Sequence, residues 1–184
     1  MKNLKGFQNT TPETFGKGIT VTSKGKWYDL YNLNKDDINI DLIATSLSRQ
    51  ARYLGHTNQV ISVAQHCYML AQSFIIIGEV DKAYQALMHD ASETWLSDVP
   101  RPLKKLIAGE YTNLEDKIEQ VLSEKYKFKY PFDDDIMVAD KNIAQYEMTV
   151  MMKHEIFSDY WSAEKAKKMF LEMFETIKTL KSYQ

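Results

Sequence analysis

The stretch VISVAQHCYMLAQSF, residues 60–74, repeats apolar side chains at intervals of three and four residues. The repeating positions are Val60, Val63, Ala64, Cys67, Leu70, Ala71 and Phe74. Because an α-helix completes a turn every 3.6 residues, this spacing places the apolar side chains on one side and predicts a helix over residues 59–77. Whether the rest of the chain follows the same period decides the fold class.

The helical period recurs on both sides of this stretch. Further helices are expected around residues 40–47, 83–87, 114–122, 136–150 and 166–180. The first of them follows an acidic cap region at Asp36 and Asp37, and another begins at the run Asp133, Asp134 and Asp135, since carboxylates favour the positive end of a helix dipole. Only residues 19–33 alternate around a Ser-Lys-Gly-Lys turn, which predicts a small hairpin. The fold class is therefore all-α, mainly helical, with an N-terminal β-hairpin.

Length and charge limit what kind of protein this is. The 184 residues, 44% of them hydrophobic, suffice for one core, so we expect a single domain over 1–184, with a hairpin extension at 1–35 and a helical core at 36–184. A net charge of -2 argues against binding to a nucleic-acid polymer. The polar start and an apolar run confined to residues 73–78 predict no membrane segment and a cytoplasmic protein. The single cysteine, Cys67, lies in the apolar pattern and is assigned to packing.

A second stretch, ALMHDASETWLSDVPRPLKK at residues 86–105, places ionisable groups inside an apparently buried helix. On one helix His89 and Glu93 would share a face, because they lie four residues apart, with Asp90 beside them. A metal ion against the helix flank could be held by such a set. Taken alone, the His-Asp pair fits a surface position or an ion pair better than a metal site.

Two further residues change that balance. His66 lies between Val63 and Leu70 on the apolar helix, so its side chain is expected to point inward, although a lone inward histidine also fits an ordinary core residue. Asp140 adjoins the apolar stripe of the helix at 136–150, where a buried carboxylate needs a cation or a hydrogen-bonding partner. Together with His89 and Asp90 they make a mixed nitrogen and oxygen set that suits Mn, Co, Fe, Zn or Mg.

These residues resemble the H…HD…D ligand pattern of the HD-domain metal-dependent phosphohydrolases. The stretches SRQARYLGHTNQVISVAQH, ALMHDASETWLSDVPRPLK and VADKNIAQYE are similar to the small 5'-deoxynucleotidase branch found in bacteria, phages and prophages. The similarity extends over about residues 18–147. It implies an HD-type helical bundle that holds one divalent metal ion, with the ligands His66, His89, Asp90 and Asp140.

The resemblance also implies roles for residues around the metal. Arg52 matches the arginine that grips the phosphate, which its planar fork can meet with two hydrogen bonds, and Tyr53 matches the aromatic residue that packs on the sugar. Glu93 and Asp98 match acidic residues that orient or deprotonate a water and assist the leaving oxygen. A surface arginine beside a core tyrosine is the alternative for the first pair.

Two other residues carry weaker expectations. Lys104, after the Pro-x-Pro turn, could add positive charge near the phosphate, or could simply be solvated. His56, in a glycine-containing loop near Arg52, could contact substrate, or could make a loop hydrogen bond. His154 is assigned no role.

The function implied is metal-dependent removal of the 5'-phosphate from deoxyribonucleoside monophosphates. One alternative is a deoxynucleoside triphosphate triphosphohydrolase, acting for example on dATP and releasing triphosphate. Another is a nucleotide- or partner-binding regulator without turnover. Tyr53 stands where the related nucleotidases often have tryptophan, which leaves the strictness of deoxyribose selection open. Family members associate, so a homodimer or larger homo-oligomer is expected.

Overall fold

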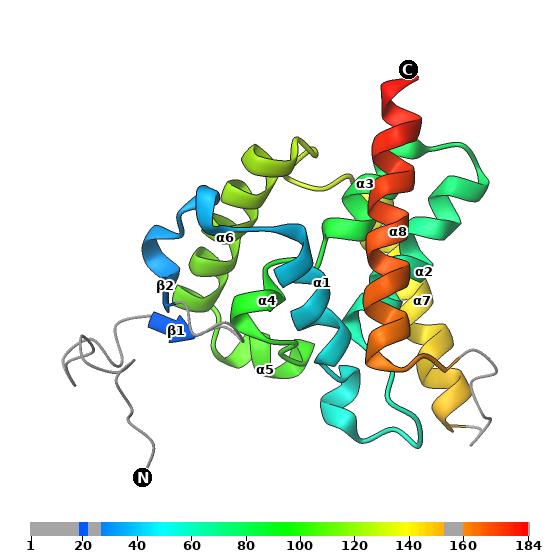
Figure 1. The fold of residues 1–184 in the computed structure, drawn as a ribbon. Helices are drawn as coiled ribbons and strands as arrows, with labels where there is room; N and C mark the ends of the chain where they lie inside the picture. Colours follow the sequence, from blue (N-terminus) through cyan, green and yellow to red (C-terminus); the bar gives the residue numbers. More distant parts are fainter. Residues whose placement is uncertain (1–18, 22–26, 153–159, 184) are drawn as a thin grey trace, which may run out of the picture.

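A computed structural model describes residues 19–21, 27–152 and 160–183. Two strands and three short 3₁₀ turns lie among a series of α-helices (Figure 1). In chain order the elements are β1 (Ile19–Val21), β2 (Trp27–Asp29), η1 (Leu30–Asn32), η2 (Lys35–Asp37), α1 (Ile40–Arg49), η3 (Arg52–Gly55), α2 (Val63–Ile76), α3 (Val80–Met88), α4 (Glu93–Leu96), α5 (Arg101–Leu106), α6 (Glu110–Tyr126), α7 (Asp134–Met152) and α8 (Ala163–Ser182).

The predicted hairpin is present. Strands β1 and β2 pair antiparallel, with Ile19 opposite Asp29 and Val21 opposite Trp27. The turn residues 23–26 lie outside the described residues. Apart from this pair and one isolated bridge between Ala51 and Ser62, the described chain is helices and connections, which confirms the mainly helical fold.

Helix α2 lies at the centre of the packing and carries His66. It contacts α1, α3, α7 and α8, and Figure 1 shows α8 lying along α2 and α3. Because neighbours surround it, almost every residue of its first turns is buried, rather than a single stripe. Ser62 caps its start by accepting a hydrogen bond from the backbone N–H of Gln65 at 3.2 Å. Gly78 follows the end of α2 and has φ of +80°. Glycine adopts this left-handed backbone conformation more readily than other residues, which suits it to the end of a helix.

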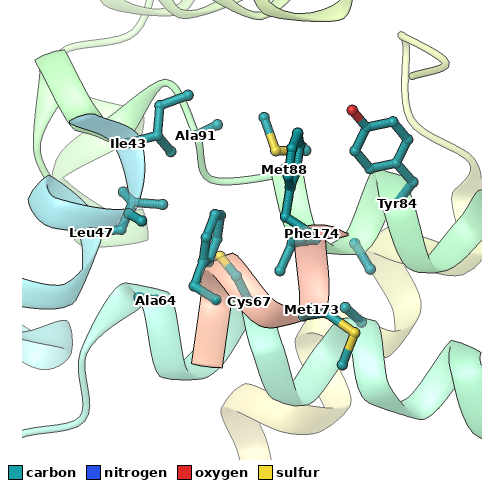
Figure 2. Packing of buried hydrophobic residues seen from close by; sticks show 14 of the residues in the cluster. Ile43, Leu47, Ala64, Cys67, Tyr84, Met88, Ala91, Met173 and Phe174 are labelled. Atoms are coloured by element: carbon teal, nitrogen blue, oxygen red, sulfur yellow. The ribbon is translucent and has the colours of Figure 1, made fainter. Parts of the chain in front are cut away.

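The hydrophobic core fills the space between α1, α2, α3 and α8. Figure 2 shows Leu47, Cys67, Met88 and Phe174, one from each of these helices, directed into this interior. All four are buried. The helical periodicity predicted this for Leu47, Cys67 and Phe174, whereas Met88 lies one residue beyond the apolar stripe expected at 83–87. Cys67 is fully buried, which fits its assignment to packing.

Helix α1 begins at Ile40 as expected, but its predicted cap region is wrong. Asp36 and Asp37 form the short turn η2, and the N-cap of α1 is Asn39, whose side chain accepts from the N–H of Leu42 at 2.8 Å. A short amide side chain at the capping position satisfies one of the unpaired N–H groups of the first turn, which carboxylates several residues earlier cannot reach.

No helix in the described part of the chain is both long enough and apolar enough to cross a membrane.

Candidate functional site

Three side chains from three helices lie close together in the structure. His66 comes from α2, His89 from the end of α3 and Asp140 from α7, and one ligand atom of each lies within 4.8 Å of the others. The His66 Nε2 atom is 3.2 Å from Asp140 Oδ1 without the alignment of a hydrogen bond. The Nε2 atoms of both histidines are buried and have no hydrogen-bond partner. Buried polar atoms are rarely left unpaired, so this cluster could hold a metal ion.

Asp90 brings a second carboxylate to the same place. Its Oδ2 lies 3.2 Å from His89 Nε2 and 3.9 Å from His66 Nε2. Burial opposes ionisation of Asp90, but the neighbouring imidazoles and Arg52 hold the pKa of its carboxyl well below its usual range. The structure therefore brings together the four residues predicted as ligands, with a charged oxygen beside both free nitrogens.

The second nitrogen of His89 faces away from the cluster. Its Nδ1 lies 2.8 Å from the carbonyl oxygen of Ala86, which can only accept a hydrogen bond, so in the neutral ring Nδ1 carries the proton and Nε2 is the atom that could bind a cation. Burial opposes a charge on His89, but Asp90 holds its pKa well above the ordinary value when no cation is bound. Cys67 Sγ is 3.9 Å from the same Nδ1 and forms a second group with His89 and Asp90. Burial raises the pKa of the Cys67 thiol to about 11, so it stays protonated at neutral pH, as a packing residue would.

His89 and Glu93 do not share one helix, contrary to the prediction. Helix α3 ends at Met88, a tight turn follows, and Glu93 begins the separate helix α4. The backbone N–H of Ser92 leaves the helical pattern and donates to the buried carboxylate of Glu119 on α6 at 3.1 Å. This contact from a distant helix replaces an intrahelical hydrogen bond, and sequence spacing cannot reveal it.

The turn nevertheless places Glu93 near Asp98. Both are held by Gln50, whose amide donates to the Glu93 carbonyl oxygen at 2.9 Å and accepts from the Asp98 N–H at 3.0 Å. Burial, together with the charges of Asp90 and Asp98, raises the pKa of Glu93 to about 9, so its carboxyl is protonated at neutral pH. Burial also raises the pKa of Asp98. The Nζ atom of Lys104 lies 3.7 Å from Oε1 of Glu93.

Arg52 belongs to the turn η3, which joins α1 to α2. The backbone N–H of Arg52 donates a hydrogen bond to the backbone carbonyl of Ile61 at 2.9 Å, and this contact holds the turn beside the start of α2. The next two residues, Tyr53 and Leu54, have φ of 58° and 56°, and Gly55 has 70°. Left-handed backbone costs roughly 1–2 kcal/mol at a non-glycine residue, so contacts elsewhere must stabilise this turn.

Those contacts come from Glu147 on α7, which is fully buried. Its Oε2 accepts from Arg52 Nε at 3.0 Å and from the Tyr53 hydroxyl at 2.7 Å, and its Oε1 is 3.0 Å from His66 Nδ1. Although burial opposes the charge, His66 and Arg52 hold the pKa of Glu147 below its ordinary value. The Arg52 Nη1 atom is 3.8 Å from Asp90 Oδ2, which places the guanidinium beside the cluster.

Glu147 and Arg101 are site residues for which no role was predicted from the sequence. A signal for Glu147 exists, because it lies seven residues after Asp140 and so on the same helical face. No pattern marks Arg101, the first residue of α5, whose side chain is 56% exposed and forms an ion pair with Asp140 Oδ2. This contact joins two elements that are distant in sequence.

The remaining predicted residues lie less centrally. Lys104 donates to Glu115 at 2.8 Å, so its charge is shared with that carboxylate. His56 is exposed at the end of η3, and in the described part of the chain no hydrogen bond or ion pair joins its side chain to the cluster. His154 lies outside the described residues.

Comparison with known proteins finds two partial relatives. No protein-family model matches the sequence. The chain is 43% identical over 107 residues to the uncharacterized protein YfdR of Escherichia coli, an alignment that covers 58% of this chain and 56% of YfdR. It is 35% identical over 100 residues to an uncharacterized protein of Rhodobacter capsulatus, covering 51% and 50%. The chain thus spans about half the length of the curated relatives it matches.

Proposed function

We propose that this protein is a metal-dependent phosphohydrolase of the HD-domain type, which removes the 5'-phosphate from deoxyribonucleoside monophosphates. One observation carries the proposal: two buried imidazole nitrogens without hydrogen-bond partners lie beside two carboxylates, with Arg52 at their edge. His66, His89, Asp90 and Asp140 would hold the ion. A divalent cation supplies positive charge that polarises a phosphoryl oxygen and acidifies a nearby water.

Arg52 supplies the second positive charge that phosphate hydrolysis needs. Its Nε donates a hydrogen bond to Glu147, and its Nη1 atom lies toward Asp90. Burial would favour the neutral form, but Glu147 and Asp90 hold the pKa of Arg52 above its ordinary value, so the guanidinium stays charged. A fixed guanidinium fork can bind two phosphoryl oxygens and stabilise the charge that develops as the ester bond breaks.

Glu93 and Asp98 divide the proton transfers. Glu93 is protonated at neutral pH and deeply buried, which suits it to donate a proton to the departing 5'-oxygen. Asp98 is less buried and accepts the proton of the attacking water. Gln50 holds both residues by hydrogen bonds to their backbones, so their separation is set by one side chain.

The activity is tested by product analysis. The metal-stripped protein is resupplied separately with Mn, Co, Zn or Mg and incubated with matched deoxy- and ribonucleoside mono-, di- and triphosphates. Orthophosphate released from deoxyribonucleoside monophosphates is the expected result. Absence of turnover with every metal and nucleotide would refute the proposed activity.

A pair of matched variants tests the site. Asp90→Asn should abolish turnover and weaken metal binding with the fold retained, because the amide loses the negative charge beside both histidines. Asp81→Asn changes an exposed carboxylate on α3 that pairs with Lys181, and it should leave activity unchanged. If Asp90→Asn kept full activity, the site would be wrong. If the wild type bound metal and nucleotide without turnover, the regulator alternative would replace the enzyme.

One observation favours a second candidate, a deoxynucleoside triphosphate triphosphohydrolase. Arg101 is largely exposed beside Asp140, and Lys104 follows one turn later on α5, so positive charge extends outward from the cluster. Such charge could bind phosphates beyond the first. Release of triphosphate, rather than orthophosphate, in the product analysis would select this activity.

A further inference from the structure

Glu147 joins two parts of the site that are far apart in sequence. Its Oε2 atom accepts hydrogen bonds from Arg52 Nε and the Tyr53 hydroxyl, which belong to the turn η3, and its Oε1 atom contacts His66 Nδ1 on α2. The three distances are 2.7 to 3.0 Å. The side chain has no exposure to solvent. All three of these partners therefore depend on one buried group that lies outside the proposed set of metal ligands.

The contact with His66 determines which of its nitrogens can bind a cation. A carboxylate only accepts hydrogen bonds, so the neutral imidazole carries its proton on Nδ1 and donates it to Glu147. The lone pair is then on Nε2, the atom that faces Asp140 and Asp90 without a hydrogen-bond partner. Carboxylates that accept from the second nitrogen of a ligand histidine commonly fix its tautomer and ring orientation in this way.

The contact with Arg52 determines where the guanidinium points. Glu147 uses the Nε–H of Arg52, while the Nη1 atom lies toward Asp90. The adjoining Tyr53 has left-handed backbone, and its hydroxyl donates to the same carboxylate oxygen. The Glu147 carboxylate therefore both stabilises the left-handed backbone of the turn η3 and orients Arg52.

We infer that Glu147 is a positioning residue that holds His66 as a cation ligand and Arg52 as a phosphate-binding group at the same time. This inference rests on the proposed function, because it takes the cluster as the cation site and Arg52 as the phosphate contact. A single change at Glu147 should therefore impair two binding reactions that would otherwise be independent.

Glu147→Gln is the decisive variant because it keeps the shape and removes one acceptor. If the new amide oxygen accepts the hydrogen bond from His66 Nδ1, the amide NH₂ group faces the Arg52 Nε–H and the Tyr53 hydroxyl, which are also donors. If the amide is reversed, its NH₂ donates to His66 Nδ1, and the proton must move to Nε2, where it blocks a cation. We expect Mn²⁺ affinity, measured by calorimetry without nucleotide, to fall about 10- to 100-fold. Affinity for inorganic phosphate at saturating Mn²⁺ should fall about tenfold or more, as expected when a charge-assisted contact is lost.

Two control variants separate this role from general damage. Asp135→Asn makes the same chemical change on α7 at a carboxylate that is 65% exposed, and it should alter neither affinity. Arg52→Met should weaken phosphate binding without weakening Mn²⁺ binding. Because each orientation of the amide still satisfies one partner, wild-type affinity for both Mn²⁺ and phosphate in Glu147→Gln would overturn the inference.

A measurement on the wild type keeps the inference testable if the variant does not fold. Nitrogen NMR of histidine-labelled, metal-stripped protein, recorded at a pH at which the imidazole is neutral, should show the His66 proton on Nδ1, and the opposite tautomer would overturn the inference. None of these measurements uses turnover. A protein that binds both ligands with the expected variant effects but hydrolyses nothing would refute the proposed activity and leave the assignment of Glu147 intact.

Discussion

Replacing Glu119 by glutamine should remove part of the pH dependence of folding. The carboxyl group is almost fully buried on α6, its Oε1 accepts from the Ser92 N–H at 3.1 Å, and its Oε2 has no hydrogen-bond partner. Burial raises the pKa of Glu119 from 4.5 to about 8, and the charge of Asp90 acts in the same direction. The folded protein therefore keeps a proton that the unfolded chain releases.

The sign and size of the effect follow from those two pKa values. At pH 4 both states hold the proton, so its contribution to stability is fully present. As pH rises from the unfolded pKa of 4.5 to the folded pKa of about 8, the unfolded state loses the proton first and the free energy of unfolding falls. Between pH 5 and pH 8 the expected loss is about 3 kcal/mol. Glutamine cannot ionise and still offers Oε1 to Ser92, so the variant should lack this loss.

Urea unfolding of the metal-stripped proteins at several pH values measures the difference. The stability of Glu119→Gln relative to wild type should increase by about 3 kcal/mol from pH 5 to pH 8. Glu124→Gln, an exposed position on the same helix, should follow the wild type throughout. Parallel curves for Glu119→Gln and wild type would refute the reasoning, because they would mean that this carboxyl titrates alike in both states.

Three further predictions concern other parts of the molecule. Arg101→Met should raise Mn²⁺ affinity by up to about fivefold in calorimetry, since an exposed ion pair with Asp140 that competes with the cation contributes at most about 1 kcal/mol; weaker binding would show that Arg101 supports the site. Gln50→Leu should lower kcat about tenfold with unchanged Mn²⁺ affinity, because it releases the backbone at Glu93 and Asp98; an unchanged kcat would contradict this. Phe170→Ala removes a fully buried ring from α8 and should lower the free energy of unfolding by about 3–5 kcal/mol in urea titration, and a loss below 1 kcal/mol would mean that the core collapses around the gap.

The helices were predictable because their signals are local. The apolar period in residues 166–180 identified α8, and the three aspartates at 133–135 marked the start of α7. The inward direction of His66 followed from its apolar neighbours on the same face, and the side chain is fully buried. Such inferences need only the geometry of one helix, which the order of residues specifies.

Contacts between different helices could not be predicted from the geometry of a single helix. The chain leaves the helical path after Met88, although the spacing of His89 and Glu93 suited one helix, because Glu119 from α6 accepts the Ser92 N–H. Glu147 lies on the same helical face as Asp140, but its three partners come from α2 and η3. Which donor meets a buried acceptor depends on how the helices pack.

By itself the sequence determined the mainly helical fold and most helix positions, and it predicted four residues as ligands of a divalent cation. Only the tertiary structure decided that these four meet, that His66 and His89 present their Nε2 atoms to the same point, and that Arg52 and Arg101 lie beside it. The physical reason is the sequence separation of the interactions involved. Helical periodicity arises from bonds four residues apart, whereas the geometry of the site depends on desolvation and hydrogen bonding between side chains as much as 95 residues apart, as in Arg52 and Glu147.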